Sequence, residues 1–258
     1  MILDELWITS PLTVGGIVFV FVAGGAMLGV LLRAYLPEHH LSAESKDVVR
    51  LGIGLLATMS ALVLGLLIAS AKTSYEAQRT DIAQMASKII LLDRILIHYG
   101  AETRQAREGL QASTAAALDR MWPSDRSRPV QLAPTAGEER IYDEILALRP
   151  VDDAQRQLRA EALRLSAEIG RTRWLLLEQQ GLTIPAPFLL LLTFWLATIF
   201  MGFGLFAPAN PTVIGTLTVC ALSIAGAIFV ILELDRPFGG LIRISSAPLR
   251  EALAQLGR

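Results

Sequence analysis

Four long runs without a charged residue divide the chain, at residues 12–32, 51–70, 188–207 and 212–232. Each run holds about 20 residues, the length that an α-helix needs to cross about 30 Å of hydrocarbon. Helix-starting pairs precede two of them, Ser10-Pro11 and Asn210-Pro211, because Ser and Asn cap helix N-termini and Pro suits the first helical position. We therefore predict four membrane-spanning helices.

The second run does not stop where its apolar residues stop. LGIGLLATMSALVLGLLIAS continues through AKTSYEAQR into TDIAQMASKIILLDRIL without a helix breaker. Beyond Lys72, apolar residues recur at alternating intervals of three and four, at Ile82, Met85, Ile89, Leu92, Leu96 and Tyr99. This spacing places them on one helix face that packs against another helix. We expect one continuous helix that leaves the membrane, runs on into water and ends at Gly100.

The segment that follows predicts more soluble helices. Ala101–Trp122 is Ala-rich and stops before Pro123, and the Pro-, Ser- and Thr-containing stretch 123–137 predicts a loop. Thr135 and Glu138 have the spacing of a capping box, which opens a helix through Leu148.

A further long helix is predicted from Asp152, as its cap, to Gln180, with Gly181 as the stop. Its apolar face comprises Leu158, Ala162, Leu165, Ile169, Thr172 and Leu176. Two such faces on either side of a loop indicate an antiparallel helical bundle.

The predicted fold class is therefore an all-α membrane protein: four transmembrane helices with a cytosolic helical bundle, the second span being continuous with a long cytosolic helix. We divide the chain into an N-terminal membrane part (1–70), the bundle with its loop (71–187), a C-terminal membrane part (188–232) and a polar cytosolic tail (233–258).

Composition agrees with a membrane protein. Of 258 residues, 53% are hydrophobic and only 18% are charged, and the mean hydropathy is +0.48, whereas soluble domains carry about 25% charged residues. The net charge of −1 gives no global field for binding nucleic acid. The single cysteine, Cys220, excludes an internal disulfide, and we interpret it as a small core residue.

The distribution of basic residues predicts the orientation. Four spans place both termini and the bundle on one side, where the basic residues near the membrane are Lys72, Arg79, Lys88, Arg171, Arg173, Arg236 and Arg243. The opposite side carries Arg33, Lys46 and Arg50. The positive-inside rule then predicts that the bundle and both termini lie in the cytoplasm, with Arg33 and Arg50 against the rule.

No motif for catalysis or cofactor binding is present. The sequence lacks a nucleophile elbow, a phosphate loop, a dinucleotide fingerprint and HExxH, so we expect neither an enzyme nor a bound cofactor. His39 and His40 are adjacent but have no third ligand nearby, and a solvated loop explains them better than a metal site.

The spans suggest how an ion could cross. Gly25 and Gly29 form a GxxxG pair, which permits close helix packing. Four packed helices leave no aqueous lumen, so a pore would lie on a symmetry axis between subunits. In such a ring Arg50 and Lys72 would become rings of positive charge at the two pore mouths, although Glu76 could cancel the charge of Lys72.

The charged group Glu233, Asp235 and Arg236 ends the fourth span and allows two interpretations. Arg236 can extend toward the membrane surface and pair with Glu233, with Pro237 stopping the helix. Alternatively the cluster is a hinge that gates or braces a pore. The first interpretation is the simpler.

Two motifs resemble the bestrophin family of anion channels. SAKTSYEAQR followed by LLDRIL is similar to the inner end of the bestrophin pore helix, and ELDRPFGG is similar to the segment after the last span. LGLLIA-x-x-x-x-SYE and LDRPFxGxIxIS look most like the bacterial bestrophin-like proteins of the DUF4239 group. The motif residues at these junctions are Ser74, Tyr75, Glu76, Arg79, Glu233, Asp235, Arg236, Pro237 and Phe238.

The resemblance implies a homo-oligomeric channel in a lipid bilayer, pentameric as in bestrophins, that conducts inorganic anions. It implies that the second span lines the pore, with a neck at Thr58, Leu62 and Leu66 on one helix face. The bulky aromatic residue of the family's neck is absent here, which leaves the constriction looser or elsewhere. The acidic calcium-binding segment of animal bestrophins is also absent after Gly240, so we expect no metal site.

Two other functions remain open at this point. The long bundle faces could bind a partner helix, in which case the chain is a non-conducting membrane scaffold or signalling protein. A transporter is weaker, because the sequence shows no broken helix and no inverted repeat.

Overall fold

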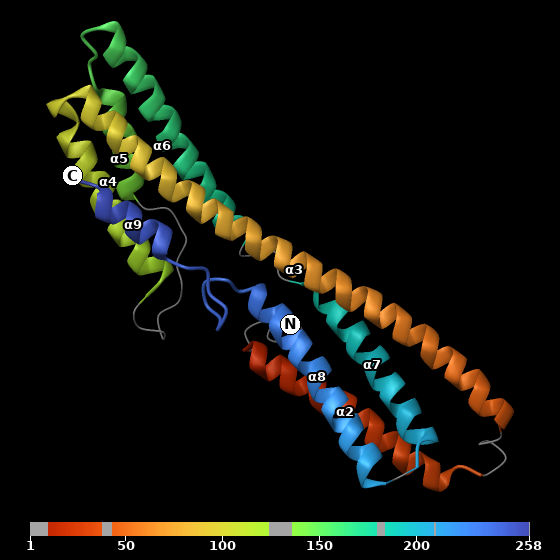
Figure 1. Cartoon of the computed structure of the whole chain (residues 1–258). Coiled ribbons are helices and arrows are strands. Elements are labelled where there is room, and N and C mark those ends of the chain that lie inside the picture. The colour runs from red at the N-terminus through yellow and green to blue at the C-terminus, as the bar shows by residue number, and fades with distance from the viewer. Residues whose placement is uncertain (1–9, 38–42, 124–135, 180–183, 209, 258) are drawn as a thin grey trace. The chain divides into compact units, whose positions relative to one another are not determined.

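The computed structural model describes residues 10–37, 43–123, 136–179, 184–208 and 210–257. Every regular element within these ranges is helical. The chain divides into two compact units, which we call the membrane unit (Met1–Thr73 with Ile184–Asp235) and the bundle unit (Ser74–Thr183 with Arg236–Arg258). Helix α3, Ala43–Tyr99, is one uninterrupted helix, and its two parts belong to the two units (Figure 1).

The membrane unit contains the four helices that are long and apolar enough to cross a bilayer: α2 (Pro11–Tyr35), the first part of α3, α7 (Ala186–Phe206) and α8 (Pro211–Leu234). The four predicted spans are confirmed within these bounds. Both predicted caps are also confirmed: the Ser10 hydroxyl accepts a hydrogen bond from the Thr13 amide at 3.2 Å, and the Asn210 side chain accepts one from Val213 at 2.8 Å.

Glycine allows α2 and α7 to pack at very short range. A Cβ atom at Gly25 would lie 2.5 Å from the carbonyl oxygen of Ala197. A Cβ at Gly29 would meet the carbonyl of Met201, and one at Gly204 would meet that of Ala26. Without a hydrophobic driving force in lipid, such close backbone contact is a main source of helix association. The structure thus gives the predicted GxxxG pair its packing partner.

Arg33 on α2 forms a hydrogen bond with the C-terminal end of α7. Its guanidinium donates a hydrogen bond to the carbonyl of Ala207, the residue that ends α7. The C-terminal carbonyls of a helix carry partial negative charge, which a cation there stabilises. This contact gives Arg33 a structural role at the end of the membrane unit's helices.

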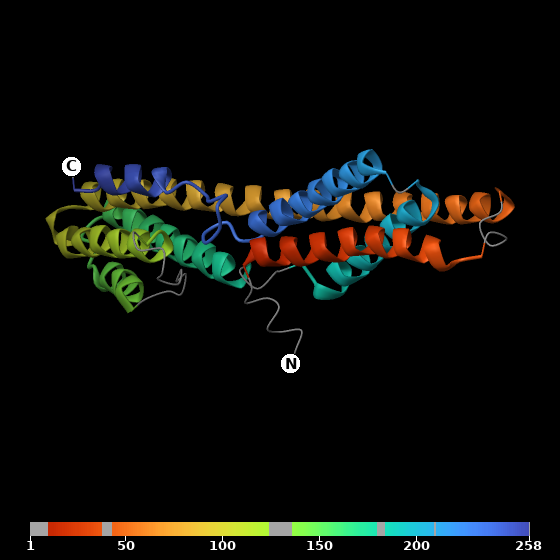
Figure 2. The same ribbon diagram turned by 90° about the horizontal axis from the view of Figure 1, so that it is seen from below.

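The bundle unit is built from five helical segments around the second part of α3: η2 (Ala101–Thr103), α4 (Arg104–Met121), α5 (Ala136–Ala147), α6 (Asp153–Gln179) and α9 (Ala247–Gln255). Figure 2 shows α4, α5, α6 and α9 lying along this part of α3. The predicted face of α3 is confirmed, since Ile82, Met85, Ile89, Leu92, Leu96 and Tyr99 are all at most 5% exposed. On α6, Ala162, Leu165 and Leu176 are buried as predicted.

Gly100 ends α3, as its sequence position predicts. It adopts φ of 135°, a conformation that favours glycine. Buried Thr103 then donates its hydroxyl to the carbonyls of Leu96, at 2.6 Å, and Gly100, at 2.8 Å. The carbonyl of Leu96, in the last turn of the long helix, is therefore satisfied as the chain turns back.

Three expectations need correction. The C-terminal segment is more than a polar tail, because it forms α9, whose Leu249 and Ala252 are fully buried in the bundle core. Cys220 is exposed on α8 and is not a core residue of the subunit. The helix predicted from Ala101 starts with one 3-10 turn.

Some predictions concern residues that the structure does not describe. These are His39, His40, Gly181 and most of the loop 123–137.

Candidate pore helix and its junction

The first part of α3 is the least covered of the four apolar helices. Only 11% of its most apolar window is buried, against 33% for α2, 39% for α7 and 33% for α8. Its contact with the rest of the membrane unit runs along one narrow face, through residues such as Leu67 and Ala71. Ile53 extends this contact by packing against α7 at Gly202, which has no side chain to keep the two helices apart. Most of this helix is thus free to meet lipid, other subunits or a pore.

The three predicted neck residues lie on the uncovered side. Leu62 is 70% exposed and Leu66 is 68% exposed, and Thr58 is also exposed. The Thr58 hydroxyl donates to the carbonyl of Gly54 at 3.0 Å, one turn earlier. Its donor is therefore used within the helix, and the face that the three residues share is predominantly apolar. Within one subunit nothing in the described part of the chain covers it.

The two predicted mouth charges lie at the two ends of this apolar stretch. Lys72 is exposed at one end. Arg50 is exposed at the other, with Asp47 one turn away and its carboxylate 3.8 Å from the guanidinium. Both partners are highly exposed, so the pair is weak. It nevertheless places a negative charge beside Arg50, which reduces the positive field expected there. Asp47 is therefore a further residue that sets the charge at this end of the helix.

The two sequence motifs meet in the bundle unit. The Tyr75 hydroxyl donates a hydrogen bond to the carbonyl of Arg243 at 3.3 Å. The Arg243 guanidinium donates in turn to the carbonyl of Gly240 at 2.9 Å, and the Ile244 amide donates to that of Pro237 at 2.8 Å. The segment after the last span is thus a compact turn held against α3. Residues about 170 positions apart are brought together here.

Phe238 anchors that turn in the bundle core. It is 3% exposed and meets the ring of Trp122 edge to face, with centroids 5.7 Å apart. The Trp122 indole donates to the carbonyl of Ile244 at 2.8 Å. Trp122 therefore completes the site from α4, although the sequence offered no signal for it because the contact joins distant segments.

The remaining motif residues have local roles. The Ser74 hydroxyl accepts from the Gln78 side chain at 3.4 Å, and the backbone carbonyl of Glu76 accepts from Thr80 at 2.9 Å. Arg79 lies with Glu76 on an exposed groove of α3. At the end of α8, Glu233 is 4% exposed, and Asp235 accepts a hydrogen bond from the Ile184 amide at 3.4 Å. Asp235 thereby ties the start of the third span to the end of the fourth.

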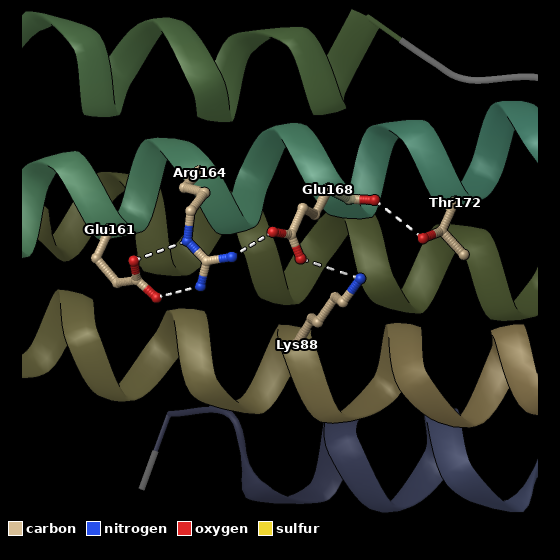
Figure 3. Close-up of polar contacts among 5 residues, drawn as sticks. All are labelled: Lys88, Glu161, Arg164, Glu168 and Thr172. Atoms are coloured by element: carbon tan, nitrogen blue, oxygen red, sulfur yellow. Dashed lines mark hydrogen bonds and ion pairs between the residues drawn. The ribbon is translucent and has the colours of Figure 1, made fainter.

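An ion-pair chain joins α3 to α6 (Figure 3). Lys88 on α3 lies 3.1 Å from the carboxylate of Glu168 on α6, which also pairs with Arg164, and Arg164 pairs with Glu161. The hydrogen bond from Lys88 is the largest cause of a lowered pKa at Glu168. The hydrogen bond from Arg164 likewise lowers the pKa of Glu161, and the same bond raises the pKa of Arg164.

A buried ion pair holds α4 against α3. Asp93, 3% exposed, accepts hydrogen bonds from two nitrogens of Arg107, at 2.8 and 3.5 Å. Asp93 belongs to the LLDRIL motif, so one motif position has a structural partner that the sequence did not indicate. Among the described residues no three His, Cys, Asp or Glu side chains are grouped to hold a metal ion.

The helices define an all-α membrane protein in which four apolar helices accompany a helical bundle. Residues 20–249 match the model of the bestrophin-like domain, so the chain belongs to the bestrophin-like family. No curated protein matches the sequence.

Similar solved structures include crystal structures of a bacterial bestrophin homolog from Klebsiella pneumoniae. An isoleucine-to-threonine variant matches with a TM-score of 0.66 and 15% identity, covering 93% of this chain and 96% of that chain. A tyrosine-to-alanine variant matches with a TM-score of 0.65 and 15% identity, covering 91% and 97%. At this identity the likeness shows a shared fold.

Proposed function

We propose that this chain is a subunit of a homo-oligomeric channel that conducts inorganic anions through a pore on the symmetry axis. The observation that carries the proposal is the low coverage of α3, 11% against at least 33% for the other three apolar helices. A ring of subunits would turn the uncovered faces of their α3 helices toward a common axis. Bestrophin-like proteins are known as ion channels rather than enzymes, which agrees with this arrangement.

The packing of the membrane unit argues against a pore inside one subunit. Backbone approaches backbone at Gly25, Gly29 and Gly204. The cavity between α2 and α8, lined by Ala23, Ala26 and Leu217 among others, has a volume of only about 100 Å³. A space of that volume holds only a few water molecules and does not form a path across about 30 Å of hydrocarbon. An ion path therefore requires several copies of the chain.

The neck would act by size and dehydration. Thr58, Leu62 and Leu66 from each copy would form successive rings, and apolar constrictions of this kind gate by excluding water. Rings of Arg50 and Lys72 would favour anions at the two mouths, with Asp47 weakening the first. The family resemblance suggests five copies, with the bundle and both termini in the cytoplasm of a bacterial inner membrane.

Single-channel recording tests this function. Purified oligomer in planar bilayers under a KCl gradient is expected to give currents that reverse near the chloride equilibrium potential. Reversal near the potassium potential would refute anion conduction. Light scattering in detergent supplies the second measurement: a ring-sized particle is expected, and a monomer would end the pore argument.

The bundle surface supports a second candidate, a scaffold that binds a protein partner. Leu91 and Leu146 are each 48% exposed, and Val151 is 84% exposed. A Leu146→Lys variant separates the two functions, because a scaffold would lose its partner in a pull-down whereas a channel would keep its current. If the Leu146→Lys variant keeps its current, the Leu146 side chain is not needed for conduction.

A further inference from the structure

The bundle unit contains a cavity that the channel function does not use. Its volume is about 200 Å³, and it lies where α3, α4, α5, α6 and α9 meet. Apolar side chains from four of these helices form much of the wall: Met85, Ile89, Leu92, Leu110, Ile141 and Leu249. A cavity of roughly 150 Å³ lined by such residues accepts benzene. The space therefore suits one substituted aromatic ring.

Small residues on α6 leave one wall open. Gly170 lines the cavity, and a Cβ atom built there would meet nothing within 4 Å. Ser166 and Ala167 line the cavity one turn earlier on the same helix. Glycine inside a helix costs about 0.5–1 kcal/mol relative to alanine. The space over Gly170 is thus open, and an added Cβ atom would fit there without a clash.

A buried cation lies at the same wall. Arg173 lines the cavity and is only 4% exposed. A guanidinium presents five N–H donors in a plane, so it can bind a ligand carboxylate in addition to a partner within the protein. The hydroxyls of Ser113 and Thr114 already donate to the carbonyl of Leu110, at 3.0 and 2.7 Å. Tyr142, Ser166 and Trp174 also line the cavity, but Arg173 is the cation among its described lining residues, so it is the group that would bind a carboxylate.

Two exposed residues that line the cavity, Glu139 and Trp174, limit the charge and the shape of that ligand. Glu139 lines the cavity from α5 and is exposed, and its carboxylate would repel a second negative charge. Trp174, 60% exposed, lines it from α6 and offers an aromatic surface. Together these residues favour a flat apolar molecule with a single anionic group.

We propose that the cavity binds a small aromatic monocarboxylate, with its ring among the apolar residues of α3 and α4 and its carboxylate on Arg173. Ring burial supplies the hydrophobic part of the affinity, and the charge-assisted hydrogen bond supplies selectivity. The site belongs to the bundle unit alone, so it stands or falls independently of conduction.

Ligand-observed ¹⁹F NMR with the full-length protein in detergent tests the site. 4-Fluorobenzoate is expected to bind with a Kd on the order of 0.1–1 mM, a normal range for a ligand of this size. The neutral isostere 4-fluorobenzamide is expected to bind about tenfold more weakly, because it cannot form the charge-assisted bond. Equal affinity for both probes, or no binding of 4-fluorobenzoate, would overturn the proposal.

Two variants locate the binding. Gly170→Leu fills the cavity, so it should abolish binding and leave the protein folded. Ala160→Leu adds one carbon less at an exposed position of α6 and should bind normally. Arg173→Gln should weaken binding of 4-fluorobenzoate about tenfold or more, and Arg171→Gln at an exposed position should not. If Gly170→Leu keeps full binding, the cavity is not the site. If it instead changes the particle size in light scattering, the cavity receives a neighbouring subunit and the proposal fails.

Discussion

The carboxylate of Asp93 on α3 and the guanidinium of Arg107 on α4 form a two-point ion pair, with nitrogen–oxygen distances of 2.8 and 3.5 Å. Asp93 is almost fully buried, and Arg107 is partly covered. An ionised carboxylate in such a place is stable only with a partner. The pair therefore makes the packing of α4 against α3 depend on both residues.

Removing one partner should strongly destabilise the bundle unit. Arg107→Gln leaves a buried carboxylate without its cation, and the expected loss is about 3 kcal/mol. Thermal unfolding in detergent, followed by near-UV circular dichroism, measures it. Arg104→Gln is the matched control, because Arg104 pairs with Glu108 on the open surface and should cost less than about 1 kcal/mol. Equal effects of the two variants would show that the Asp93 pair has no special role.

The glycine contacts between α2 and α7 predict a sharp positional effect. Gly29→Ala places a methyl group against the carbonyl of Met201, which should cost about 1–3 kcal/mol through strain and helix displacement. Gly24→Ala on the same helix meets nothing within 4 Å and should be neutral or slightly stabilising. Comparing the melting temperatures of the two variants in detergent decides the matter. A neutral Gly29→Ala would contradict the close approach.

Cysteine accessibility tests the proposed pore face. In a Cys220→Ala background, Leu62→Cys should react with a charged, water-soluble thiol reagent, and the modification should reduce the current by several-fold or more, because it places charge in the apolar neck. Leu191→Cys is the control, since Leu191 is exposed on α7, a helix outside the proposed pore. Block at Leu191→Cys alone would assign the pore to another helix, and equal block at both positions would contradict a pore face formed by α3 alone.

The link between α3 and α6 should weaken in acid. The hydrogen bond from Lys88 lowers the pKa of Glu168 from its ordinary value of 4.5. A carboxylate whose folded-state pKa is lowered stabilises the protein above the unfolded-state pKa, and that contribution disappears as pH falls through the folded-state pKa. Glu168→Gln should therefore lower the melting temperature at pH 7. The difference from the unmodified protein should shrink as pH falls below about 4.5 and vanish below the folded-state pKa of Glu168.

Glu161→Gln supplies the comparison for that titration. In the unmodified protein the pKa of Glu161 is also lowered, by the hydrogen bond from Arg164, but Glu161 and Arg164 both lie on α6. The substitution should therefore change the melting temperature less than Glu168→Gln, which breaks a contact between two helices. A difference that persists unchanged at low pH would refute the ionic origin of the link.

Local patterns along the chain were sufficient for much of the fold. Run length identifies a membrane span because the thickness of hydrocarbon is constant, and Ser10 and Asn210 cap helices through atoms only three residues away. The buried face of α3 follows from helical periodicity alone. The resemblance carried by the Tyr75 and Phe238 motifs led to the family that the domain match shows.

The C-terminal helix shows where such patterns fail. Helix α9 has only nine residues, too few for the positions of Leu249 and Ala252 to indicate by themselves what they pack against. A short helix is stabilised by tertiary packing rather than by its own propensity. Its place in the core could not be inferred before the helices that cover it were positioned. Cys220 shows the opposite error, because it was expected in the core and is exposed. The apolar residues around it in the sequence do not decide which side of a span faces the other helices.

The sequence by itself determined the four apolar helices, the continuous helix through Tyr99 and the family, because these depend on composition, period and short motifs. Only the tertiary structure decided which partners meet: Asp93 with Arg107, Tyr75 with the carbonyl of Arg243, and Arg173 with the cavity beside Gly170. The first two contacts join residues 14 and 168 positions apart in the chain. The energies of all three arise from burial and geometry that exist only once the helices have packed.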